Sequence, residues 1–223
     1  MSAQQQTINR LPQSTQPKAL RFLATVVSYV FHPIFMPLAM SVVLWKLEPS
    51  VFEPFIAGQK LWLISIGIST LFIPLFTVFL MKQLDFINSY AMPTARDRTG
   101  PLMAIMIFYF WISHVFNSVP GPVPLVLKVL FLGNFWGIII VFIANIFTKV
   151  SMHTSAAGGV IGVVIVLMMT APGNMTLPLL IAIVLAGIIG TARMILGTHQ
   201  RGDIWLGYII GILVQLGAYI YMR

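Results

Sequence analysis

The sequence contains no cysteine among its 223 residues and few charged residues. Without cysteine the chain can form no disulfide, no thiolate metal site and no cysteine nucleophile. Charged side chains make up only 8% of the residues, and only five residues are acidic. This leaves too little polar surface to solvate a globular protein of this length. The absences exclude a disulfide-stabilised fold and an ordinary water-soluble enzyme.

Hydrophobic residues make up 58% of the chain, and the mean hydropathy is +0.94. Apolar runs close to the ~20 residues that cross a ~30 Å hydrocarbon core recur along the sequence. Backbone polar groups must be paired internally in lipid, so these runs predict helices. We therefore expect an all-α, polytopic transmembrane helix bundle of about six to seven spans, in a bacterial inner (plasma) membrane. The candidate segments are residues 24–46, 61–81, 101–118, 124–147, 154–171, 176–192 and 204–221.

The N-terminal part of the chain consists of a polar stretch followed by a first apolar segment that contains prolines. Residues 1–22 are rich in Gln, Ser, Thr and Pro and predict a disordered polar tail, which leaves residues 23–223 as one transmembrane domain. The first apolar segment contains Pro33 and Pro37 in the stretch FHPIFMP. These prolines predict either two half-helices or a re-entrant element.

The formal net charge of +8 indicates which partners to expect. The basic residues are scattered at the ends of the apolar segments and form no patch with interleaved aromatic residues, so no nucleic-acid partner is expected. Anionic membrane lipid and a lipid phosphate substrate suit this distribution better. The sequence leaves the oligomeric state open.

Polar residues gather in three clusters between the apolar segments. The clusters are 96–98 after the second segment, 151–155 after the fourth, and 193–203 after the sixth. An even number of crossings separates each cluster from the next, so all three are expected at the same membrane face. The bundle can therefore assemble them into one site.

In the last cluster, His199 and Asp203 stand four residues apart. On one helical face the carboxylate can accept the Nδ1 proton of the imidazole, which leaves Nε2 free to attack or to take a proton. The alternative is a helix cap, because aspartate is favoured at helix starts.

The middle cluster has Ser151 and His153 just before the small residues 156–159. Free backbone N–H groups at a helix start, with hydroxyl groups nearby, can bind an anion, and a histidine there can donate a proton to a leaving oxygen. The alternative is ordinary helix capping, with the small residues serving helix packing.

The first cluster offers Arg96 and Arg98, which Pro93, Gly100 and Pro101 are expected to keep in a loop. Arginine side chains suit phosphate oxygens. The alternative is a basic loop that only sets the orientation of the protein in the membrane.

Two further histidines, His32 and His114, lie within apolar runs. We expect each to make a helix-to-helix hydrogen bond and neither to bind a ligand, which disfavours a di-histidine haem bundle.

The clusters together resemble the type 2 phosphatidic acid phosphatase superfamily, the membrane lipid phosphatases related to vanadium haloperoxidases. Arg193, His199 and Asp203 have the spacing of the family's third signature. The stretch 150–153 resembles the second signature, Pro-Ser-Gly-His, with valine and methionine in place of proline and glycine. For the first signature, a lysine six residues before Arg-Pro, Arg98 is the arginine near a proline.

The resemblance implies a hydrolase that transfers a phosphoryl group without a metal or another cofactor. His199 would form a phosphohistidine, Asp203 would orient it, and His153 would protonate the leaving group. The groups expected to hold the phosphoryl oxygens are Arg193, Ser151 and Arg98, with Arg96 able to replace the lysine of the first signature. The implied function is a phosphatase of phospholipid metabolism that acts on a lipid phosphate or isoprenoid diphosphate.

Two other functions remain open from the sequence. One is a membrane transporter whose polar clusters bind an anion without chemistry, which predicts functional polar residues near mid-span or on both faces. The other is a non-catalytic protein that binds lipid phosphate. The membrane face of the site is also open, because a re-entrant first segment would separate the N-terminus from the site.

Overall fold

The computed structural model describes residues 16–58, 61–90 and 95–223, and within these ranges the fold is helical without strands. The helices are α2 (Lys18–Val30), η1 (Pro33–Phe35), α3 (Met36–Leu47), α4 (Pro49–Gly58), α5 (Trp62–Gly67), η2 (Ile68–Phe72), α6 (Ile73–Gln83), α7 (Ala95–Ser118), α8 (Leu125–Phe147), α9 (Met152–Thr170), α10 (Thr176–Ile195) and α11 (Arg201–Met222).

Seven helical segments are long and apolar enough to cross a membrane, which confirms the expected bundle. They are Lys18–Leu47, Trp62–Gln83, Thr99–Ser118, Leu125–Phe147, Met152–Thr170, Thr176–Ile195 and Arg201–Met222. Large apolar side chains such as Phe147 and Ile220 are more than 70% exposed on the outside of the bundle. Such exposure is unfavourable in water and ordinary against lipid tails.

The first membrane segment is a pair of half-helices. Helix α2 ends at Val30, and α3 begins after the short turn η1. The segment runs the whole length of the bundle, because α3 leads into Glu48, whose carboxylate packs against Gly173 in the loop between α9 and α10. Helix α2 begins at Lys18, inside the expected tail of residues 1–22, and residues 1–15 of that tail lie outside the described residues.

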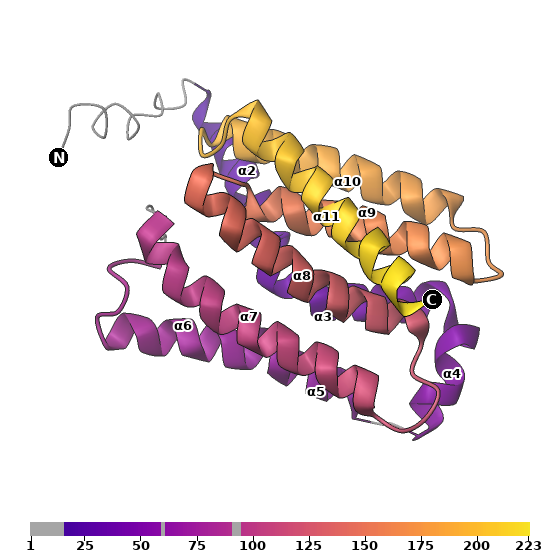
Figure 1. The fold of residues 1–223 in the computed structure, drawn as a ribbon. Coiled ribbons are helices and arrows are strands. Elements are labelled where there is room, and N and C mark those ends of the chain that lie inside the picture. Colours follow the sequence, from indigo (N-terminus) through magenta and orange to yellow (C-terminus); the bar gives the residue numbers. More distant parts are fainter. Residues whose placement is uncertain (1–15, 59–60, 91–94) are drawn as a thin grey trace.

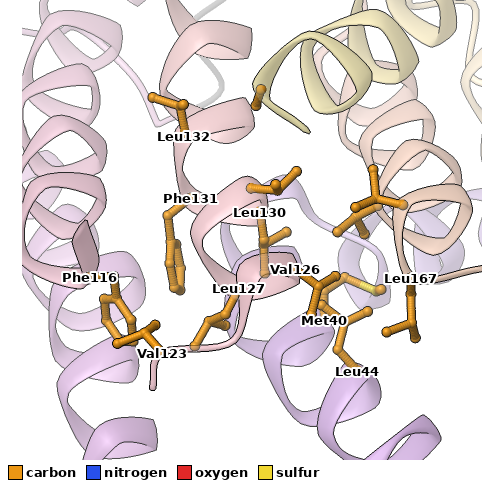
Figure 2. Close-up of a cluster of buried hydrophobic side chains, with 14 of the residues drawn as sticks. Met40, Leu44, Phe116, Val123, Val126, Leu127, Leu130, Phe131, Leu132 and Leu167 are labelled. Atoms are coloured by element: carbon orange, nitrogen blue, oxygen red, sulfur yellow. The ribbon is translucent and has the colours of Figure 1, made fainter. Parts of the chain in front are cut away.

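The largest apolar cluster surrounds the first half of α8 (Figure 2). Leu127 and Phe131 are fully buried on the side of α8 toward Phe116 of α7, and Val126 and Leu130 lie on the side toward Met40 of α3. This packing fixes α8 in the centre of the bundle, with α7 on one side and α9 and α11 on the other (Figure 1).

Glycines hold α9 and α11 in direct backbone contact. A Cβ atom on Gly158 would meet the backbone of Tyr208, and one on Gly211 would meet the backbone of Ser155 and Gly159. Small residues at such a crossing let two membrane helices approach closely. The two helices start at the same end of the bundle (Figure 1), so this contact sets the relative position of the two polar clusters at their starts.

Candidate functional site

A cavity of about 840 Å³ opens inside the bundle. One end is lined by His153, Arg193 and His199, near the start of α9, the end of α10 and the start of α11. The cavity continues toward the opposite end of the bundle, where Met40 and Leu130 contribute to its mostly apolar wall. The structure thus brings His153, His199 and Arg193 to one cavity.

His153 lies in the first turn of α9 and is buried. Its Nε2 atom lies 3.1 Å from the backbone carbonyl oxygen of Ser28 in α2. A carbonyl oxygen only accepts hydrogen bonds, so Nε2 carries the proton and donates it. The Nδ1 atom is then the nitrogen that can exchange a proton with a ligand.

Arg193 lies in the last turn of α10, where a cation also complements the helix dipole. Its Nη1 atom donates to the hydroxyl oxygen of Ser28 over 3.2 Å. Ser28 therefore holds two candidate site residues at once, His153 through its carbonyl group and Arg193 through its hydroxyl group. Sequence reasoning missed Ser28, which lies inside an apolar run without any motif.

Asp203 caps the start of α11, and its carboxylate also lies close to the ring of His199. The Nδ1 atom of His199 lies 3.6 Å from Oδ2 of Asp203, and the two side chains are only 7% and 16% exposed. The same carboxylate oxygen accepts the backbone N–H of Gln200 at 2.9 Å in a capping box at the start of α11. The carboxylate thus caps the helix and stands beside the imidazole.

Ser151 does not line the cavity. It is fully buried, and its hydroxyl oxygen accepts the backbone N–H of Thr154 as the N-cap of α9, over 3.5 Å. Its backbone N–H donates to the carbonyl oxygen of Asp203 over 3.3 Å, which ties the starts of α9 and α11 together. The expected contact of this side chain with a phosphate is therefore replaced by the capping alternative.

Arg96 and Arg98 were expected in a loop, but they lie in the first turns of α7. The helix continues through Pro101, because one missing backbone donor near the start of a 24-residue helix costs less than leaving the chain unpaired at the membrane. The side chains of both arginines lie outside the described residues. Their role in holding a phosphate stays a prediction.

Two basic residues that the sequence did not assign to the site also line the cavity. Lys149 does so from the connection between α8 and α9, two residues before Ser151. Its place in the same polar stretch as His153 was the available signal. His32 lines the cavity too, and its ring centroid lies 5.3 Å from that of His153.

The helix-to-helix hydrogen bonds expected for His32 and His114 are not present among the described residues, and the expectation that neither binds a ligand stays a prediction. The side chain of His32 accepts a hydrogen bond from the backbone N–H of Ile34, two residues along the same segment. It reaches the site because η1 bends the first membrane segment at this point. His114 is exposed on α7 and makes ring contacts with Phe110 and Trp111 of the same helix. The span count could not find His32, because its position depends on the geometry of the break.

The arrangement can bind a phosphorylated headgroup and exchange protons with it. Arginine and lysine supply positive charge, and the imidazoles supply donors and acceptors. Within the part of the chain that the structure describes, no group of three His, Asp or Glu side chains is placed to hold a metal ion. Searches against protein-family models, curated proteins and solved structures found no match to this chain.

Proposed function

We propose that this chain is an integral membrane phosphatase of the type 2 phosphatidic acid phosphatase superfamily, acting on a lipid phosphate or isoprenoid diphosphate through a phosphohistidine. The observation that carries the proposal is the meeting of His153, Arg193 and His199 at the polar end of one otherwise apolar cavity. A lipid has the same division into a charged headgroup and an apolar chain.

The reaction divides into two steps. In the first, which starts with His153 protonated on both nitrogens, Nε2 of His199 attacks phosphorus, the bond from phosphorus to the lipid oxygen breaks, and His153 gives that oxygen its Nδ1 proton. In the second, Nδ1 of His153 takes a proton from water, whose oxygen displaces His199 and releases phosphate. The Nε2–H group of His153 can stay hydrogen-bonded to the carbonyl oxygen of Ser28 throughout. This hydrogen bond therefore holds the ring in place during both steps.

Charge on the transferring group has to be stabilised as well. A phosphoryl group in transfer spreads negative charge over three equatorial oxygens. Arg193 is positioned by its hydrogen bond to Ser28, and Lys149 lines the same cavity. Pre-positioned cations of this kind need little reorganisation during the reaction, which is the condition for effective electrostatic catalysis.

The test is phosphate release by the purified protein in detergent. Phosphatidic acid, phosphatidylglycerol phosphate and undecaprenyl diphosphate are the substrates to compare. We expect release from at least one of them, and we expect His199→Ala to abolish it while the thermal unfolding temperature stays close to that of the wild type. His114→Ala is the matched control, because His114 is exposed and does not line the cavity. Wild-type rates in His199→Ala would exclude the phosphohistidine.

A transporter is the second candidate, and one observation favours it. The buried Gln215 in α11 donates to Asn134 of α8 over 3.2 Å, and both residues line the cavity far from the starts of α9 and α11. A transporter is expected to have such polar groups near mid-span. Uptake of phosphate or a phosphorylated solute by proteoliposomes, without hydrolysis, would favour this candidate over the phosphatase.

A further inference from the structure

A third imidazole, that of His32, stands at the cavity beside the proposed catalytic pair. His32 belongs to the break between α2 and α3, and its ring meets that of His153 edge to face, at an interplanar angle of 86°. It lines the cavity together with Arg193 and His199. The proposed reaction uses neither of its nitrogen atoms.

The hydrogen bond within the break fixes the tautomer of His32. Its Nδ1 atom accepts the backbone N–H of Ile34 over 3.3 Å and caps the turn η1. A nitrogen that accepts a hydrogen bond carries no proton, so the proton of the neutral ring is on Nε2. Within the described residues, Nε2 has no hydrogen-bond partner, and His32 lines the cavity.

The break between α2 and α3 leaves backbone groups without helical hydrogen bonds, which is unfavourable in a membrane unless other groups pair with them. Pro33 and Pro37 lack backbone donors, and irregular backbone at membrane depth occurs where it lines a cavity or is buried in protein. Interrupted helices in membrane proteins commonly carry binding sites at the interruption. Here the interruption places one imidazole against the cavity next to another.

We propose that His32 is a substrate-contacting residue that donates a hydrogen bond from Nε2 to an oxygen of the phosphate group. This inference rests on the proposed function, because it takes the ligand of the cavity to be a phosphorylated lipid. Phosphate oxygens are strong acceptors, and the ring lies beside His153 and in the same cavity as Arg193. The contact holds the phosphate on the side of the proposed proton donor.

The competing explanation is that His32 is only the cap of η1, and His32→Asn separates the two. Asparagine is a favoured capping residue and can accept the N–H of Ile34, but its shorter side chain removes the Nε2–H donor from the cavity. If His32 contacts phosphate, His32→Asn is as defective as His32→Ala. If it is only a cap, His32→Asn behaves like the wild type.

The experiment measures equilibrium binding to the detergent-solubilised protein. Phosphatidic acid is compared with diacylglycerol, and undecaprenyl diphosphate with undecaprenol, so that only the phosphate group differs within each pair. We expect His32→Asn and His32→Ala to bind the phosphorylated lipid about tenfold or more weakly, the loss typical of a hydrogen bond to a charged group. Binding of the alcohols and the unfolding temperature of His32→Asn should stay unchanged, and His114→Ala should match the wild type throughout.

The outcomes separate this inference from the proposed function. Unchanged affinity of His32→Asn for both phosphorylated lipids overturns the role of His32, even when the wild type releases phosphate. A wild type that binds phosphatidic acid better than diacylglycerol but releases no phosphate from any of the lipids overturns the phosphatase, while a tenfold loss in His32→Asn still supports the contact. His32→Gln, whose amide N–H extends further, should recover part of the affinity.

Discussion

The Nδ1 atom of His199 lies 3.6 Å from a carboxylate oxygen of Asp203, and that same oxygen accepts the backbone N–H of Gln200. One side chain thus holds the start of α11 and faces the imidazole that we propose as the nucleophile. Because the two roles use different properties of the carboxylate, a substitution can separate them.

Asp203→Asn should retain the cap and lose the orienting charge. The amide oxygen of asparagine can still accept the N–H of Gln200, so the free energy of unfolding should fall by only about 1 kcal/mol or less. The imidazole loses the negative charge that stabilises its Nδ1 proton, and we expect kcat to fall about a hundredfold with little change in KM. Steady-state phosphate release and thermal unfolding check both parts. Unchanged kcat would leave Asp203 with the capping role only.

Gly211→Ala should destabilise the fold and the site together. The new Cβ atom would meet the backbone of Ser155 and Gly159 on α9, which cannot move aside like a flexible side chain. We expect a loss of about 1–3 kcal/mol of stability, the usual cost of overpacking, seen as a lower unfolding temperature in detergent.

Gly187→Ala is the matched control for the α9–α11 contact. Gly187 is also in the middle of a membrane helix, but a Cβ atom there meets nothing within 4 Å. Alanine should leave stability unchanged or raise it slightly through its higher helix propensity. Equal losses in both variants would mean that the loss at Gly211 is not specific to this contact.

Lys149→Ala should weaken binding of the phosphorylated lipid, because Lys149 lines the cavity and adds a second positive charge to that of Arg193. A phosphoryl group spreads its charge over three oxygens, and one arginine does not neutralise all of it. Lys82→Ala should have little effect, since Lys82 at the end of α6 does not line the cavity. Titration of both variants with phosphatidic acid checks this, with about a tenfold loss expected for Lys149→Ala. If Lys82→Ala loses affinity and Lys149→Ala does not, the second cation of the site comes from the end of α6.

Arg98→Ala should lower both affinity and turnover. Pro101, Leu102 and Ile105 line the cavity from α7. Arg98 stands three positions before Pro101 and four before Leu102, a spacing that puts these positions on the same face of the helix. Arg96→Ala should act mainly on affinity. Kinetics of phosphate release over a range of lipid concentrations separates the two effects, and wild-type behaviour of Arg98→Ala would remove it from the site.

The site should face the cytoplasm. The first segment runs the length of the bundle, so Lys18 at its start and the site share one membrane face, and eight of the eleven Lys and Arg residues in the described ranges belong to that face. These eight are Lys18, Arg21, Lys82, Arg96, Arg98, Lys149, Arg193 and Arg201.

The absence of cysteine makes this orientation simple to measure. Thr148 and Ser118 are exposed near opposite ends of the bundle, and each can be replaced by a single cysteine. A membrane-impermeant maleimide should label Thr148→Cys in inside-out vesicles and Ser118→Cys in right-side-out vesicles. The opposite labelling would place the site on the outer face.

The sequence by itself determined the spans and the shared face of the polar clusters. A lipid environment requires every backbone donor and acceptor to be paired within its own segment, so apolar runs of sufficient length have to be helices. Counting crossings then places 151–155 and 193–203 at one face without knowledge of packing. The expected shared helical face of His199 and Asp203 was wrong, because α11 begins at Arg201 and His199 lies in the bend before it, so the two side chains come together at the helix start.

Only the tertiary structure decided which polar side chains reach the cavity. Ser151 and His153 are two residues apart, yet one is a buried cap and the other lines the cavity. His32 and Ser28 come to His153 from more than a hundred residues away, because the break after α2 and the packing of α2 on α10 bring them there. Such contacts depend on the angle of a kink and on the close approach of glycine-bearing helices, which are set by the packing of the whole bundle and leave no local pattern in the sequence.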